Sequence, residues 1–143
     1  MDYNTDIKIK DGIDQMDFDR VRDMLKDVFW SIGIKKDEVI QGAKNSALVV
    51  GVFDSGKQVA FARVISDKTR FAYIMDVVVH EDYRKQGLGQ LMMKYILHHP
   101  DLKDVYQWLL KTRDAHGVYE KAGFKVISDP DKWMEIMPGR PER

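Results

Sequence analysis

Cysteine is absent from this chain of 143 residues. Its absence excludes disulfide bonds, thiolate zinc sites and any mechanism that uses an acyl-cysteine intermediate. An excess of charge of one sign is also missing, because 23 lysines and arginines balance 23 aspartates and glutamates. Without a general basic field we expect no nucleic-acid partner, so that any anion must be bound by local charge.

Long apolar runs are missing too, since no stretch approaches the roughly 20 residues that a membrane-spanning helix needs. The first residues, Met1 to Asp6, show no basic and apolar signal segment. We therefore expect no membrane partner and a cytoplasmic location. What is present, 44% hydrophobic and 32% charged residues, is ordinary for a globular protein. The length favours a single domain over residues 1–143.

The most informative stretch spans residues 71–97. Its first part, residues 71–79, is rich in β-branched and aromatic residues and predicts a strand buried on both faces, with Asp76 as its one charge. Its last part, residues 88–97, has apolar residues at the spacing of one helix face, and Pro100 ends that pattern. The loop between them therefore lies where a strand passes into the first turn of a helix.

Four residues of this loop suit an anion. Gly87 and Gly89 carry no side chain that would hold a phosphate away from the unpaired amides of the helix start, and Arg84 and Lys85 add positive charge. Glycines also serve ordinary turns and helix caps, so the pair alone leaves both interpretations open. The spacings of a P-loop and of a dinucleotide-binding fold are both absent.

The pattern Arg84-x-x-Gly87-x-Gly89, after an apolar strand, resembles the acetyl-CoA-binding motif of the Gcn5-related N-acetyltransferases (GNATs). The resemblance implies that backbone amides of the loop hold the CoA pyrophosphate, while the preceding strand pairs with the pantetheine arm. The acetyl-CoA contacts that it implies in this sequence are Val77, Val78, Val79, Arg84, Lys85, Gln86, Gly87, Leu88, Gly89 and Gln90.

A second segment, Ala115–Phe124, resembles another stretch of the same family, Ala-x-x-apolar-Tyr-Glu-Lys-x-Gly-Phe. The resemblance implies that Tyr119 faces the CoA sulfur and protonates the departing thiolate. Reference pKa values of a phenol and a thiol differ by only about one to two units, so this transfer is not steeply uphill. The alternative is that Tyr119 simply packs in the core. Thr112 stands where many members have an asparagine that contacts the cofactor, and threonine is shorter.

Acetyl transfer to an amine also needs a polarised carbonyl and a route for a proton. An N–H of Val77 or Val78, freed by a bulge in the strand, would point at the developing oxyanion. Asp76 is the candidate base or amine anchor, because a carboxylate in so apolar a strand needs a wet cleft or a partner. The alternative is a structural carboxylate held by Arg63 or a backbone amide.

The sequence does not identify the acceptor. In the family, the early helical region overhangs the acceptor site, so the resemblance gives Phe29, Trp30 and Ile34 as residues that line a substrate pocket, although such side chains commonly just pack. Tyr73 of the predicted strand is the further candidate for substrate binding. They suit a small amine with an apolar body, and equally a peptide amino terminus or a lysine side chain. The four histidines show no metal-like spacing, and only His116, close to Tyr119, is kept as a candidate.

The remaining patterns complete an α/β (α+β) fold of the GNAT kind. We expect a mixed, mostly antiparallel sheet of about six to seven strands with about four helices, whose two central parallel strands diverge to form the acetyl-CoA cleft. Strands are predicted over residues 7–10, 47–53, 59–65, 71–79, 105–110, 124–127 and 133–137; helices over 18–30, 35–44, 88–97 and 115–122, capped in part by Asp17 (or Asp14) and Asp114; and a frayed tail over 138–141.

The sequence thus predicts an acetyl-CoA-dependent N-acetyltransferase that uses no metal and transfers the acetyl group to a primary amine within a ternary complex. The alternative is a non-catalytic acyl-CoA-binding regulatory module that keeps the fold without acceptor chemistry. Exposed strand edges near the carboxyl end also make a homodimer possible.

Overall fold

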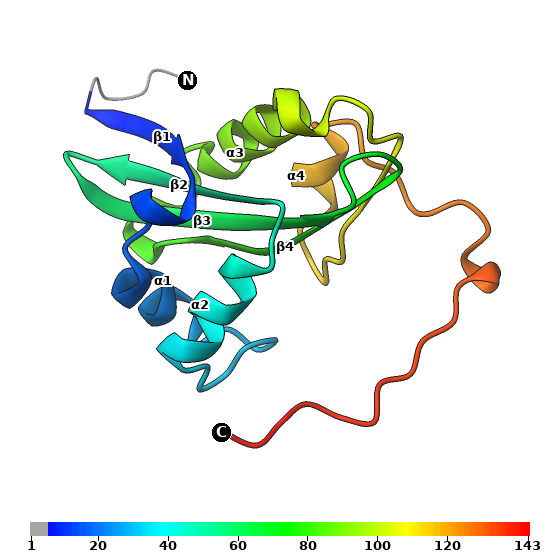
Figure 1. Cartoon of the computed structure of the whole chain (residues 1–143), viewed down its shortest axis with the longest axis horizontal. Helices are drawn as coiled ribbons and strands as arrows, with labels where there is room; N and C mark the ends of the chain where they lie inside the picture. The colour runs from blue at the N-terminus through cyan, green and yellow to red at the C-terminus, as the bar shows by residue number, and fades with distance from the viewer. Residues whose placement is uncertain (1–5) are drawn as a thin grey trace.

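A computed structural model describes residues 6–143 of the chain. It contains one five-stranded sheet with α3 and α4 toward one face and α1 and α2 on the other (Figure 1). The strands are β1 (Ile7–Asp11), β2 (Leu48–Asp54), β3 (Lys57–Ser66), β4 (Phe71–Val79) and β5 (Gln107–Leu109), and the helices are α1 (Phe18–Leu25), α2 (Lys36–Lys44), α3 (Leu88–Leu97) and α4 (His116–Glu120).

The strands lie side by side in the order in which they occur along the chain. The first four are antiparallel to their neighbours, with β2, β3 and β4 as a meander and β1 joined to β2 through α1 and α2, and β5 runs parallel to β4 after the crossover through α3. Only residues 71–73 of β4 pair with residues 107–109 of β5. The rest of β4 therefore diverges from β5, which confirms the predicted mixed sheet with two splayed parallel strands.

A β-bulge interrupts β4 where it begins to diverge. Phe61 pairs with Val78 and Arg63 pairs with Met75, so that two residues of β4 lie opposite one residue of β3. Asp76 is one of these two, and its φ of 55° lies in the left-handed region, which non-glycine residues seldom adopt. The bulge thus lies in the segment where the sequence analysis expects a freed backbone amide.

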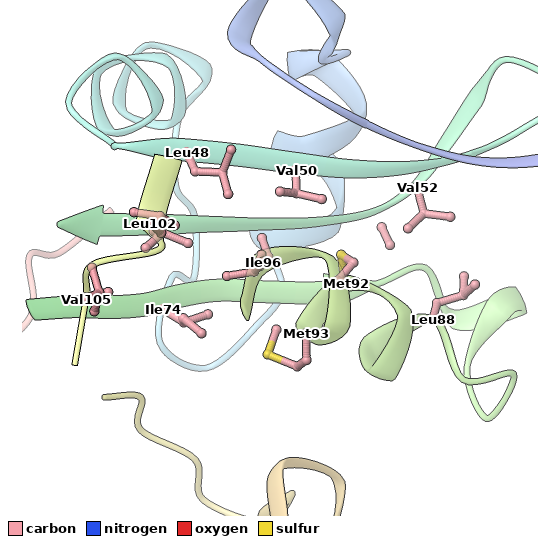
Figure 2. Close-up of a cluster of buried hydrophobic side chains, with 14 of the residues drawn as sticks. Leu48, Val50, Val52, Ile74, Leu88, Met92, Met93, Ile96, Leu102 and Val105 are labelled. Carbon is pink, nitrogen blue, oxygen red and sulfur yellow. The ribbon is translucent and has the colours of Figure 1, made fainter. Parts of the chain in front are cut away.

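Two apolar cores, one on each face, hold the helices to the sheet. Figure 2 shows the larger one, in which Met92, Met93 and Ile96 of α3 pack on the face of β2, β3 and β4. The smaller core lies under α1 and α2 and contains Val21 and Leu25. Each fully buried side chain of this size stabilises the fold by about 1.5–3 kcal/mol, so α3 and α1 are both held mainly by burial.

Helix α1 starts as predicted and ends earlier than predicted. The carboxylate of Asp17 accepts a hydrogen bond from the Arg20 amide at 3.2 Å and caps the helix. The helix ends at Leu25 and does not continue to residue 30, because the Leu25 carbonyl accepts bonds from the Ser31 hydroxyl at 2.6 Å and the Val28 amide at 3.2 Å. The aromatic pair that follows α1 therefore lies on a loop.

The predicted carboxy-terminal hairpin, residues 124–127 with 133–137, does not form. The chain after α4 is irregular except for a short 3-10 turn, Pro130–Lys132, so the sheet has five strands where the sequence analysis expects about six to seven. Pro130 lacks an N–H, Asp129 has a left-handed φ of 53°, and the neighbouring edge of β5 is only three residues long. This segment arcs away from the body and returns toward α2 (Figure 1).

Across residues 6–143, no helix is both long and apolar enough to cross a bilayer. Within the same range, histidine, aspartate and glutamate side chains nowhere gather in a group of three or more that would hold a metal ion.

Candidate active site

The glycine-containing loop follows β4 and a short 3-10 turn, Glu81–Tyr83, and leads into α3. Lys85 and Gly87 both have left-handed backbone conformations, with φ of 62° and 79°, and Gly87 precedes the first residue of the helix. No side chain in the described part of the chain caps this helix end. The Arg84 side chain donates to the Val79 carbonyl at 3.2 Å, so its charge stays beside the end of β4. The loop therefore offers helix-start amides and cationic groups together, as an anion requires.

The space around Gly89 indicates whether the start of α3 fits a bound phosphate group. A Cβ built at Gly89 would lie 3.8 Å from a methyl carbon of Val118, which is ordinary van der Waals contact. Packing within the protein therefore does not require glycine at this position. A glycine without an internal reason fits a ligand that must approach the backbone closely. The Gln90 side chain also donates to the Val118 carbonyl and ties the first turn of α3 to α4.

A cavity of about 1180 Å³ lies beside the junction of β4 and β5. Tyr73, Thr112, His116 and Tyr119 line it, together with part of the irregular segment after α4. Burial raises the pKa of the Tyr119 hydroxyl above its usual value. This phenol therefore keeps its proton at neutral pH, which is the state that an acid needs. The Tyr119 ring also contacts the edge of Phe124, with 6.2 Å between centroids.

Thr112 closes the turn that precedes the short helix α4, and the helix cap that the sequence analysis assigns to Asp114 does not form. The Thr112 hydroxyl oxygen accepts a hydrogen bond from the Ala115 amide at 2.9 Å, and no side chain caps α4 from Asp114. Asp114 is exposed and lies 3.7 Å from Arg113. A hydroxyl oxygen can accept from an amide a few residues further on in a turn, so Thr112 orders the chain that leads into α4. The hydroxyl hydrogen of Thr112 is not used by this bond.

Asp76 lies on the α1 and α2 side of the sheet and has two protein partners. Its Oδ2 is 2.7 Å from Nε of Arg63, and its Oδ1 accepts a bond from Nε1 of Trp30 at 3.1 Å. Arg63 also donates to the Gly42 carbonyl and the Ser46 hydroxyl, each at 3.3 Å. The carboxylate is thus held by Arg63, as its structural interpretation expects, and its role as base or amine anchor stays a prediction.

The structure brings Trp30 and Tyr73 close to Asp76 and leaves Phe29 at the rim. Burial and the charge of Asp76 both raise the pKa of the Tyr73 hydroxyl. Phe29 is 40% exposed, packs edge-on against Trp30 with 5.2 Å between ring centroids, and lies 4.0 Å from the Arg113 guanidinium. Phe29 therefore bridges the loop after α1 and the loop before α4, next to the site that Trp30 lines.

A second, smaller cavity of about 200 Å³ opens beside Asp76. Glu38 of α2 and Arg143 line it, and neither appears among the residues that the sequence analysis selects. A glutamate on an amphipathic helix carries no signal that distinguishes it from a solvated side chain. The tail was expected to fray, yet Arg143 donates two hydrogen bonds to Glu38, at 2.8 and 2.6 Å. This end of the chain is therefore held against α2.

Residues 44–126 match the sequence model of the acetyltransferase (GNAT) domain. This range covers more than half of the chain, from the end of α2 through the glycine loop to the segment after α4. The chain belongs to the GNAT acetyltransferase family. The resemblance seen in the sequence and the fold seen in the structure thus agree.

Two curated relatives are N-acetyltransferases named ycf52, both uncharacterized. The one from Pyropia yezoensis is 32% identical over 93 residues, which cover 62% of this chain and 52% of the relative. The one from Gracilaria tenuistipitata var. liui is 36% identical over 74 residues, covering 51% and 40%. This chain therefore spans about half the length, or less, of these relatives.

Solved structures share the whole architecture. A protein of Xanthomonas campestris pv. campestris, assigned to the GNAT family, has 34% identity and a TM-score of 0.83, with 92% of each chain covered. A protein of Clostridium acetobutylicum, whose structure includes acetyl-CoA, has 17% identity and a TM-score of 0.69, with 92% of this chain and 96% of that chain covered. The second likeness is one of fold alone.

Proposed function

We propose that this protein transfers the acetyl group of acetyl-CoA to a primary amine, on a small molecule or a peptide, by direct transfer in a ternary complex. The observation that most supports this proposal is the position of β4 between two cavities. Tyr73 of β4 lines the larger cavity and Asp76 of β4 lines the smaller one, with the bulge beside them. A direct transfer needs two substrates to meet at one place, and the bulged end of β4 provides it.

The larger cavity and the glycine loop together suit acetyl-CoA. When bound, this co-substrate supplies an acyl thioester that an amine can attack. We assign the pyrophosphate to the amides of residues 86–90, with Arg84 and Lys85 adding charge, and the pantetheine to the backbone of residues 77–79. Thr112 can still donate its hydroxyl hydrogen, because its bond to Ala115 uses only the oxygen as acceptor.

We assign the steps of the acetyl transfer to three groups of this chain. Tyr119 holds a proton in the larger cavity and is the acid that we assign to the thiolate. The backbone N–H of Val77 or Val78, at the bulge, is the donor that we assign to the developing oxyanion. Asp76 is the group that we assign to anchor the amine and to take up the proton that the amine loses, since Arg63 and Trp30 donate only one bond to each of its oxygens and a carboxylate has lone pairs for about four.

Calorimetric titration of acetyl-CoA tests the proposal first. We expect micromolar binding to the wild-type protein and none to Gly87→Glu, because glutamate puts a carboxylate against the phosphate site and is strained at the left-handed φ of Gly87. Release of free CoA is then followed with a panel of amines and peptides. Stimulation by some amine would support the transferase, whereas tight binding without turnover on any acceptor would favour the regulatory module.

A further inference from the structure

Two carboxylates, Asp76 and Glu38, line the smaller cavity, and they differ in their partners and in their exposure. Asp76 is paired with Arg63, and their side chains are only 10% and 15% exposed, so these two charges balance each other inside the cavity wall. Glu38 lies in the first turn of α2 at the cavity mouth, and its side chain is 49% exposed. Beside it, Trp30 and Ile34 provide apolar surface. Without the Arg143 side chain, which pairs with Glu38, the cavity would therefore combine one uncompensated negative charge with an apolar wall.

The chain itself shows which group enters this cavity. Both Nε and Nη2 of Arg143 donate to Glu38, one to each carboxylate oxygen, at 2.8 and 2.6 Å. The Arg143 side chain is only 13% exposed. A guanidinium is planar and matches a carboxylate with two parallel hydrogen bonds, which an ammonium group cannot do. The occupant is therefore recognised by shape as well as by charge.

Gly33 leaves room for this arrangement. A Cβ built at Gly33 would lie 2.9 Å from Cβ of Arg143, closer than real Cβ contacts allow. Gly33 also has a φ of 72°, which only glycine adopts without strain. The hydrogen bond between Glu38 and Arg143 lowers the pKa of the Glu38 carboxyl, which keeps it ionised at neutral pH. Gly33 thus makes room for the main chain and Cβ of residue 143, from which the Arg143 guanidinium reaches Glu38.

We propose that Glu38 is a specificity-determining residue that binds a guanidinium group of the acceptor, and that Arg143 occupies the same position until an acceptor displaces it. The acceptor class is then a molecule that carries both a primary amine and a guanidinium. This inference rests on the proposed acetyl transfer. Glu38 and Asp76 line one cavity, so a short flexible chain would place the guanidinium on Glu38 and the amine near Asp76 and the bulge.

The test compares two amines of the same chain length. Agmatine carries a primary amine and a guanidinium on a four-carbon chain, and butylamine carries the amine alone. We expect agmatine to have a kcat/KM about tenfold higher, the factor that one additional charge-assisted hydrogen-bonded pair provides. A tripeptide amide that begins with arginine presents the same two groups, and its rate relative to agmatine distinguishes a peptide source from a small-molecule source.

Three variants locate the effect on the cavity. Arg143→Ala should lower KM for agmatine, because the competing guanidinium is gone, and should lower it by a larger factor than KM for butylamine, which has no guanidinium to bind Glu38. Glu38→Gln should raise KM for agmatine to that of butylamine with kcat unchanged. Asp37→Asn removes one negative charge from the same helical turn, and Asp37 is exposed and does not line the cavity, so it should change neither constant. Thermal unfolding of each variant verifies its fold.

Calorimetry of agmatine alone separates this inference from the proposed function. Binding to Arg143→Ala that is lost in the double variant with Glu38→Gln would support the guanidinium site even if no amine were acetylated. Equal rates for agmatine and butylamine, or an agmatine KM that Glu38→Gln does not change, would overturn the inference while acetyl transfer stands.

Discussion

Arg63 Nε lies 2.7 Å from Asp76 Oδ2 at the point where β4 leaves register with β3. The same arginine reaches the Gly42 carbonyl and the Ser46 hydroxyl, at the end of α2, and Asp76 also holds the Trp30 indole. One ion pair thus connects the bulge, α2 and the loop after α1. The shape of the smaller cavity, which Arg63 and Asp76 both line, depends on this pair.

Asp76→Ala should lower the free energy of unfolding by about 1–3 kcal/mol. The substitution leaves the Arg63 guanidinium without its carboxylate in a place where both side chains are mostly buried. Urea denaturation measures the loss, and Asp104→Ala, at an exposed position, is the control that should stay close to wild type. An Asp76→Ala variant as stable as the control would mean that the pair contributes nothing net.

Tyr119→Phe should reduce kcat by about a hundredfold, within the range of general acid catalysis, and leave acetyl-CoA binding unchanged. Burial raises the pKa of Tyr119, and activity requires the protonated phenol, so wild-type activity should persist above the usual tyrosine pKa of about 10 and fall as pH rises through the raised value. The residual activity of the variant should lack this alkaline decline.

Tyr95→Phe is the matched control for that experiment. The Tyr95 hydroxyl donates to Asp11 of β1, which is at the opposite edge of the sheet from β5, and this hydrogen bond is the main cause that raises the pKa of Tyr95 to about 12. Its removal should lower stability and leave kcat unchanged. If Tyr119→Phe and Tyr95→Phe lowered kcat equally, the acid role of Tyr119 would be wrong.

Gly89→Ala should separate ligand binding from folding. The added methyl group meets only ordinary contact with Val118, and alanine favours a helix over glycine, so stability should stay level or rise by about 0.5–1 kcal/mol. Acetyl-CoA affinity should fall about tenfold, because the methyl group holds the ligand away from the amides. Thermal unfolding and calorimetry on one sample measure both quantities. Unchanged affinity would place the phosphate elsewhere.

The homodimer stays a prediction, and the structure suggests where to test it. In the described part of the chain, β5 has a partner on one edge only, and the segment after α4 exposes Met134 and Ile136 at 95% and 97%. The double variant Met134→Lys/Ile136→Lys should be monomeric by light scattering at micromolar concentration, where wild type is a dimer. Ile32→Lys, at another exposed apolar position, should remain dimeric. A monomeric wild type would contradict the prediction.

Local sequence patterns predicted the sheet up to β5 because each of those elements carries its own signal. The apolar run of β4 and the helical spacing of α3 can be recognised without knowing which elements pack against them. The hairpin after α4 was predicted by the same alternation and is wrong, because pairing depends on a partner edge and β5 offers three residues. Whether a strand finds a partner, and in which register, depends on two segments together, so the sequence of one segment does not determine it.

In the candidate site, too, the sequence predicted the residues that lie within local motifs and missed the contacts between distant segments. The glycine loop and Tyr119 lie within motifs, so their positions followed from sequence. The partnership of Asp76 with Arg63 was one of two interpretations, and the bond from Trp30, 46 residues away in the chain, was not foreseen. Glu38 and Arg143 are 105 residues apart, and nothing in either local pattern points to the other.

The strand order has a consequence for how the chain folds. Because short turns join β2 to β3 and β3 to β4, these three strands need little loop closure and should assemble early, whereas α1 and α2 separate β1 from β2 along the chain. β5 joins through three residue pairs after a crossover, so it should dock last. In native-state hydrogen exchange, the amides of β5 should open at lower free energy than those of β2 and β3. The cleft between β4 and β5 is then the last part of the molecule to form and the first to come apart.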